Sequence, residues 1–238
     1  MSKTKITFIS DTHTKERELK LSGGDILIHA GDIMNSGYDR YDITDFLDWF
    51  AEQPYPIKIF IAGNHDRYLE NFPDKAKEIT DKYLLLNDIL YLQDEEYIYH
   101  PNEDNEEQGI KIYGSPWQPE FYNWAFNLPR NGKDLESKWS AIPEDTDILI
   151  THGPPQEHLD TSGPPYNEPL LGCELLRDRV DQVKPKIHVF GHIHGGYGYK
   201  FHDGTLFINA SVLNERYVQT NKPIDILYDT ENKEIEII

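Results

Sequence analysis

The stretch Ile-His-Val-Phe-Gly-His-Ile-His, at residues 187–194, shows the pattern from which the fold can be predicted. A short apolar run ends there at a glycine, and two histidines follow it. The run is continuous rather than alternating, which is typical of a strand covered on both faces. Similar runs recur along the chain, at residues 6–10, 26–30, 57–62, 110–114, 148–151 and 187–190.

Helical patterns separate these predicted strands. The clearest covers residues 43–53, where five apolar residues follow the i, i+3, i+4, i+7, i+8 spacing of one buried stripe. Further helices are predicted at 73–86, 132–141 and 171–183. Toward the C-terminus the sequence predicts two hairpins, one from residues 199–202 and 205–209 and one from 224–228 and 234–238. Together these elements predict a layered α/β architecture.

The composition narrows the classes of function. The 238 residues include 23 lysines and arginines against 42 aspartates and glutamates, and the net charge of -19 disfavours binding to long nucleic acids or to anionic membranes. The single cysteine, Cys173, can form no internal disulfide, and no apolar run reaches the length of a membrane span, so we expect a cytoplasmic protein. We expect one domain over residues 1–238, and a solvated turn at the acidic stretch 102–108.

Polar motifs follow five of the predicted strands. Strand ends in α/β sheets face a common crevice, so side chains from different strand ends can converge there. Each motif alone is weak, because a lone buried histidine is more often a hydrogen-bonded core residue than a ligand. The five motifs are Asp11-Thr12-His13, Gly31-Asp32, Gly63-Asn64-His65-Asp66, His152-Gly153 and Gly191-His192-Ile193-His194.

These side chains suit a pair of divalent transition metals. Imidazoles favour zinc, manganese, iron or nickel, and a carboxylate can bridge two cations. Residues two apart in an extended segment point the same way, so Asp11 with His13, and His192 with His194, can each contribute two groups to one cavity. The other histidines in or near strands, His29, His100, His188 and His202, are predicted to be structural.

In this order the motifs resemble the signature of the calcineurin-like metallophosphoesterase superfamily, with every element present. The similarity extends to the segments 113–117, 127–130, 151–155 and 186–198, which resemble the metallophosphoesterase-domain-containing branch of that superfamily. The resemblance covers nearly the whole chain and implies a four-layer α/β/β/α sandwich with mixed sheets and a dimetal site at the strand ends.

The resemblance also implies a role for each motif residue. Asp32 would bridge the two metals, and His65 would protonate the leaving oxygen as a general acid while a metal-bridging hydroxide attacks phosphorus. Manganese is expected to support activity in vitro. One metal would be held by Asp11, His13 and His194, and the other by Asn64, His152 and His192.

Some family members place a second aspartate three residues after the bridging one, where it orients the histidine. Here that position is Asn35. A neutral amide can hold an imidazole by a hydrogen bond, but it cannot stabilise imidazolium as a carboxylate would.

The branch resemblance points to small phosphodiesters, particularly cyclic nucleotides. The candidate substrate contacts are Asn35, Arg67, Trp117 and His158, and Arg130 is a further cation near the motifs. The segment 113–130 is rich in aromatic residues, which either form a wall on which a base stacks or anchor an irregular loop onto the core.

Three alternatives stay open: a nuclease of the same superfamily, a phosphomonoesterase, and a protein-binding scaffold that uses the fold without catalysis. The acidic charge opposes the nuclease, and the complete set of motif histidines opposes the scaffold. The sequence is compatible with either a monomer or a homodimer.

Overall fold

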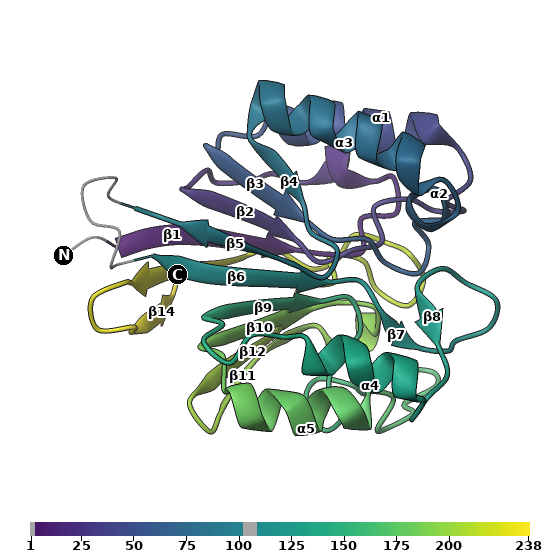
Figure 1. Cartoon of the computed structure of the whole chain (residues 1–238), viewed down its shortest axis with the longest axis vertical. Coiled ribbons are helices and arrows are strands. Elements are labelled where there is room, and N and C mark those ends of the chain that lie inside the picture. The colour runs from purple at the N-terminus through teal and green to yellow at the C-terminus, as the bar shows by residue number, and fades with distance from the viewer. Residues whose placement is uncertain (1–2, 102–108) are drawn as a thin grey trace.

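A computed structural model describes residues 3–101 and 109–238 of the chain. Two β-sheets pack face to face, and helices cover the outer side of each sheet (Figure 1). This arrangement confirms the α/β/β/α sandwich predicted from the sequence. The acidic stretch 102–108, for which we predicted a turn, lies outside the described residues.

The first sheet has four parallel strands extended by an antiparallel hairpin at one edge. The predicted hairpin near the C-terminus is confirmed here, and its inner strand pairs with the first strand of the chain. In spatial order the strands are β14 (Ile235–Ile237), β13 (Ile224–Asp229), β1 (Lys3–Ile9), β2 (Ile26–His29), β3 (Ile57–Phe60) and β4 (Ile89–Tyr91).

The second sheet also has four parallel strands, with one antiparallel strand at each edge. The second predicted hairpin, β11 with β12, is confirmed. The order is β11 (Gly198–His202), β12 (Thr205–Asn209), β10 (Ile187–Phe190), β9 (Ile148–Thr151), β6 (Ile110–Ser115) and β5 (Glu95–Tyr99). A separate short pair joins β7 (Gln118–Pro119) and β8 (Asn127–Leu128).

Helices lie on the outer faces of the two sheets. Figure 1 shows α1 and α3 over the first sheet and α4 and α5 over the second. Among the described residues, none of the helices is long and apolar enough to cross a bilayer. The helices are α1 (Arg40–Ala51), α2 (Arg67–Asn71), α3 (Pro73–Asn87), α4 (Lys133–Ser140) and α5 (Glu174–Val183), with short 3₁₀ turns η1 (Glu16–Glu18) and η3 (His194–Gly196).

The continuous apolar runs are explained by burial on both faces of each sheet. In β2, Ile26 and Ile28 enter the core between the sheets, whereas Leu27 packs with the residues of α1. In the second sheet, Ile150 joins the same central core, and Leu149 packs with α4 and α5. Successive side chains of a strand point to opposite faces, so residues on both faces of such a strand are mostly apolar.

Element boundaries differ from the sequence predictions where a side chain caps a helix. The α1 helix begins at Arg40, three residues earlier than predicted, because the Asp39 side chain accepts a hydrogen bond from Tyr41 N. The α5 helix begins at Glu174 rather than 171, because the Cys173 side chain accepts a hydrogen bond from Leu176 N at 3.4 Å. The short elements β4, β5 and α2 were not predicted, because three to five residues carry too little periodicity.

Candidate metal centre

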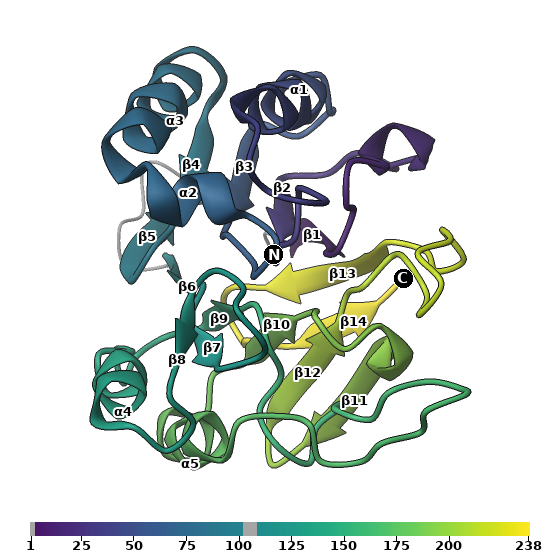
Figure 2. The ribbon, with the colours of Figure 1, turned by 90° about the vertical axis from the view of Figure 1, so that its right-hand side faces the viewer.

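The motif residues lie on loops at one end of the molecule, where the parallel strands of both sheets terminate. Figure 2 shows the molecule from the side on which β7, β8 and α2 lie. The loops after β1 and β2 are joined directly: Asp11 N donates to Gly31 O at 2.9 Å, and His13 N donates to Asp32 O at 3.1 Å. At Gly31 (φ 96°) a Cβ atom would lie 2.6 Å from His152 Nδ1, so only glycine allows this approach.

Three overlapping groups of ligand atoms converge at this end: one consists of His13, Asp32 and His65, and the other two consist only of predicted metal ligands. Of these two, Asp11, His13 and His194 form the first, and Asp32, His152 and His192 form the second; within each group, one ligand atom per residue lies within 4.8 Å of the others. Asp32 Oδ2 is 3.6 Å from His13 Nε2 and 3.4 Å from His152 Nε2, so this carboxylate lies between the two groups.

Backbone carbonyls orient three of the imidazoles. The Nδ1 atoms donate to carbonyl oxygens, from His13 to Met34 at 3.0 Å, from His152 to Ala30 at 2.9 Å and from His194 to Asn214 at 3.0 Å. Each Nε2 is thereby left to face the cluster, which is the usual arrangement of histidines that bind metals.

The donor set fits divalent transition metals. His13 Nε2 is buried and has no hydrogen-bond partner among the described residues. Asn64 Oδ1 lies 3.0 Å from His152 Nε2 and adds an oxygen to the second group. Imidazole nitrogens with carboxylate and amide oxygens are ligands that such ions accept.

Burial and charge divide the four histidines into two pairs. Burial lowers the pKa of His13 to about 4 and of His192 to about 3, so both are neutral at pH 7. Burial also opposes protonation of His152 and His194, but the carboxylates of Asp32 and Asp11 outweigh it and raise both pKa values to about 9.

The same contacts keep the two carboxylates ionised. Burial acts to raise the pKa of Asp11 and of Asp32, but the neighbouring histidines outweigh it and hold both pKa values well below the usual range. The metal-free cluster therefore contains two carboxylate–imidazolium pairs, which divalent ions would replace.

Asp66 joins the loops that carry Asp32 and Asn64. Its Oδ2 accepts from Gly63 N at 2.7 Å, from Asp32 N at 3.0 Å and from Ile33 N at 3.3 Å, and its Oδ1 accepts from Met34 N at 2.8 Å. The sequence analysis included this fully buried residue in a motif but gave it no role. Its acidic side chain directly after Asn64-His65 was the available signal.

His65 is held on three sides. Its backbone N donates to Asp32 Oδ1 at 2.7 Å, and its Nδ1 donates to the carbonyl oxygen of Asn35. Its ring stacks on Trp124, with ring centroids 4.0 Å apart and planes at 26°. The expectation that the Asn35 amide orients this histidine is corrected: the side chain of Asn35 is exposed, and the backbone carbonyl makes the contact.

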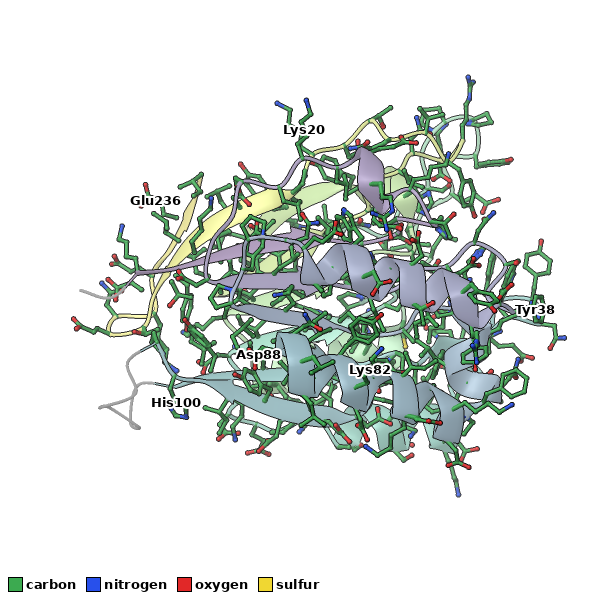
Figure 3. The ribbon with its side chains drawn as sticks, turned by 90° about the horizontal axis from the view of Figure 1, so that it is seen from above. Lys20, Tyr38, Lys82, Asp88, His100 and Glu236 are labelled. Atoms are coloured by element: carbon green, nitrogen blue, oxygen red, sulfur yellow. The ribbon has the colours of Figure 1, made fainter. Side chains whose placement is uncertain are left out.

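Arg67, a predicted substrate contact, does not line the pocket and instead packs on the ring of Trp124. Its guanidinium lies 4.5 Å from the centroid of the Trp124 ring and 5.0 Å from that of Tyr38, and Nη2 donates to Asn123 O at 2.7 Å. Figure 3 shows Tyr38, which contacts Arg67, and His100 at opposite ends of the molecule. His100 therefore lies far from Arg67 and Trp124.

Two predicted substrate contacts lie elsewhere. Trp117 donates from Nε1 to Asp94 at 2.8 Å and packs on Phe126 in the core. His158 is buried and stacks on Phe207 of β12, with centroids 3.8 Å apart. Neither lines the pocket at the metal centre, so the structure corrects both expectations.

A pocket of about 530 Å³ opens above the metal centre. Asp32, Asn64 and His65 line its floor, and Phe121 and Tyr122 line one wall. The aromatic segment therefore divides: Tyr113 and Phe126 belong to the core and Trp117 packs against it, whereas Phe121 and Tyr122 face the pocket.

The loop 211–217 contributes to the site and was missed by the sequence analysis. Ser211 Oγ donates to Asp11 Oδ2 at 2.8 Å, and Asn214 O accepts from His194. Glu215 Oε1 accepts from Gly163 N at 2.8 Å and from Gly195 N at 3.0 Å. No spacing or residue type in this loop marks it as part of a metal site.

Comparisons with known proteins agree with this geometry. A family model described as calcineurin-like phosphoesterase matches residues 4–196. The human and mouse proteins named metallophosphoesterase domain-containing protein 1 are each 41% identical over 241 residues, covering 94% of this chain and 70% of theirs. A Caenorhabditis elegans protein named UPF0046 protein T07D4.2 is 38% identical over 233 residues, which cover 91% of this chain and 58% of that protein.

Among solved structures, the phosphopantetheinyl hydrolase of Mycobacterium tuberculosis superposes with a TM-score of 0.63 at 16% identity, covering 99% of this chain and 96% of that one. At this identity the likeness concerns the fold alone. The family match and the 41% identical relatives carry the assignment. The chain belongs to the calcineurin-like phosphoesterase family.

Proposed function

We propose that this protein is a dimetal-dependent phosphodiesterase that hydrolyses small organic phosphodiesters, with cyclic nucleotides as the expected substrates. The main support is the position of Asp32, whose Oδ2 lies between two groups of ligand atoms at the floor of one pocket. A carboxylate shared in this way is suited to two cations, and family membership supports a metal-dependent phosphoester hydrolase.

Seven side chains would hold the two ions. When bound, the ions would supply a water of lowered pKa as nucleophile and positive charge facing the phosphoryl oxygens. Manganese, iron, zinc and nickel all suit these ligands. Asp11, His13 and His194 would hold one ion, Asn64, His152 and His192 the other, and Asp32 both.

His65 is the proposed general acid. Nδ1–H donates to the Asn35 carbonyl, so Nε2 is the nitrogen that can transfer a proton to the leaving oxygen. The carbonyl accepts the same hydrogen bond whether the ring is neutral or protonated. Trp124 restricts the rotation of the ring by stacking on it.

The charges around the pocket favour a singly charged diester over a doubly charged monoester. Among the described lining residues, Arg130 is the only arginine or lysine, and its guanidinium is engaged by Glu174 Oε2 at 2.6 Å and by two carbonyls. Glu120, Glu168 and Glu215 also line the pocket. The exposed rings of Phe121 and Tyr122 offer apolar surface to a nucleobase.

The test is a comparison of substrates on protein loaded with each metal in turn. We expect manganese-loaded protein to hydrolyse bis-p-nitrophenyl phosphate and 2′,3′- or 3′,5′-cyclic nucleotides faster than p-nitrophenyl phosphate, and chelation to abolish all three activities. Faster hydrolysis of the monoester would favour a phosphomonoesterase. Two bound metals without activity on any substrate would favour the scaffold.

His65→Ala tests the assigned acid. We expect kcat for a cyclic nucleotide to fall roughly 10²- to 10⁴-fold with metal content unchanged. The loss should be smaller for bis-p-nitrophenyl phosphate, because p-nitrophenolate leaves readily without a proton. His202→Ala, an exposed histidine on β11, is the matched control and should retain activity. Loss of metal from the His65 variant would show that the assigned role is wrong.

A further inference from the structure

Tyr217 lies against the histidines of the metal centre and lines the pocket. Its ring centroid is 4.8 Å from that of His13, 5.2 Å from that of His194 and 6.4 Å from that of His65. The phenol therefore lies on the side of the first group of ligand atoms and within reach of the space above them.

The backbone presents this side chain in a fixed and unusual conformation. Tyr217 has φ 56°, in the left-handed region that bulky residues rarely adopt. Its N–H donates to Asn214 O at 2.8 Å, and its carbonyl accepts from Lys15 Nζ. Asn214 Oδ1 accepts from Arg216 N at 2.9 Å and from Val218 N at 3.1 Å, which braces the residues on both sides.

This loop is also coupled to the metal centre. The carbonyl of Asn214 that accepts from Tyr217 N accepts from His194 Nδ1 as well. Backbone strain held by several hydrogen bonds is common where a side chain must be presented to a substrate. The position of the phenol is thus tied to that of a candidate metal ligand.

Among the described residues, the hydrogen bonds of Tyr217 are made by its backbone and none by its hydroxyl. The side chain is partly exposed to the pocket. Because Arg130 is already engaged, a phosphoryl group in this pocket would need donors other than a free cation. A neutral O–H at this place can supply one.

We propose that Tyr217 is a catalytic residue whose hydroxyl donates a hydrogen bond to a non-bridging phosphoryl oxygen of the substrate, on the side of His13 and His194. The assignment rests on the proposed function. A preorganised donor strengthens as charge builds on that oxygen in the transition state. Since it adds no formal positive charge, it suits a singly charged diester.

The test compares Tyr217→Phe with Tyr217→Leu and with Tyr199→Phe, a control that removes an exposed hydroxyl on β11. We expect Tyr217→Phe to lower kcat for bis-p-nitrophenyl phosphate on the order of 10²-fold, with two metals per chain and the Tm unchanged. Tyr199→Phe should match the wild type. A Phe variant with wild-type kcat, beside a Leu variant that loses activity, would show that only the ring matters and would overturn the proposal.

A binding measurement separates failure of this proposal from failure of the proposed function. Orthophosphate is titrated calorimetrically into manganese-loaded wild type, Tyr217→Phe and Tyr199→Phe. Weaker phosphate binding in Tyr217→Phe alone supports the hydrogen bond even if the wild type hydrolyses none of the diesters. Equal affinities in all three proteins overturn it, whatever the activity.

Discussion

Asp32 contacts several neighbours in the site through both its backbone and its carboxylate. Its backbone adopts φ 58°, its N–H is bound by Asp66, its Oδ1 accepts from His65 N and its Oδ2 faces two imidazoles. Each contact serves a different neighbour, so the carboxylate cannot turn without losing one of them. The position of the proposed bridging ligand is therefore set before any metal binds.

At the same scale, the raised pKa values of His152 and His194 predict proton release on metal binding. Both pKa values are about 9 in the metal-free site, so both rings are protonated at pH 7 and must each lose a proton to become ligands. Filling the site at pH 7 should release close to two protons per chain from these histidines, in addition to one from a water that ionises to the hydroxide, and metal affinity should rise with pH until about pH 9. Calorimetric titration in buffers of different ionisation enthalpy measures the number.

The control for this prediction is the pH at which the titration is made. Well above pH 9 both histidines are already neutral, so the number of protons released should be lower by close to two. Release of the same number of protons at pH 7 and well above pH 9 would show that the carboxylates do not hold these imidazoles protonated.

Among the elements, the segment 117–128, which includes β7 and β8, combines two kinds of aromatic residue. Trp117 packs on Phe126, and Lys138 Nζ lies 4.4 Å from the centroid of its ring. Trp124, seven residues later, stacks on His65 and on the guanidinium of Arg67. One end of the segment thus anchors to the core, and the other supports the proposed general acid.

Replacing each of the two tryptophans by alanine should affect different properties, kcat in one case and stability in the other. Trp124→Ala should lower kcat about 2- to 10-fold, because an aromatic stacking contact is worth roughly 0.5 to 1.5 kcal/mol. Trp117→Ala should leave kcat nearly unchanged but lower the free energy of unfolding by about 3 kcal/mol. Steady-state kinetics and urea unfolding of both variants measure kcat and the free energy of unfolding. Similar losses of kcat and of stability in the two variants would contradict the different roles assigned to Trp117 and Trp124.

Over the whole molecule, the chain carries a large net negative charge, whereas the metal centre would be positive once two ions are bound. Two divalent ions would bring +4 against -2 from Asp11 and Asp32 and -1 from a hydroxide, so the filled centre would carry about +1 within a chain of net charge -19. Such a crevice can accept a small anion while the remaining surface repels long ones.

This charge distribution predicts an effect of salt. Raising ionic strength to about 0.3 M screens the acidic surface, so kcat/KM should rise more for dianionic p-nitrophenyl phosphate than for monoanionic bis-p-nitrophenyl phosphate. Sodium and potassium chloride should act alike if the effect is screening. An equal or opposite response of the two substrates would refute this view of the charge.

The sequence by itself determined most of the fold. All six apolar runs are strands and all four helical patterns are helices, since burial on two faces or on one stripe leaves a local periodic signal. It also determined which motif residues come together, because each follows a strand and parallel strands end at one edge of a sheet. The division of the strands between two sheets and the assignment of each metal ligand were expected from the family resemblance, not from local order along the chain.

Only the tertiary structure decided what surrounds those residues. The carbonyl rather than the amide of Asn35 meets His65, Trp124 rather than Trp117 supports it, His158 stacks on Phe207, and Tyr217 enters the pocket from a loop without a motif. Each contact joins segments that are distant in sequence. Such contacts depend on how side chains of many elements pack at once, and packing of this kind leaves no periodic trace in the sequence.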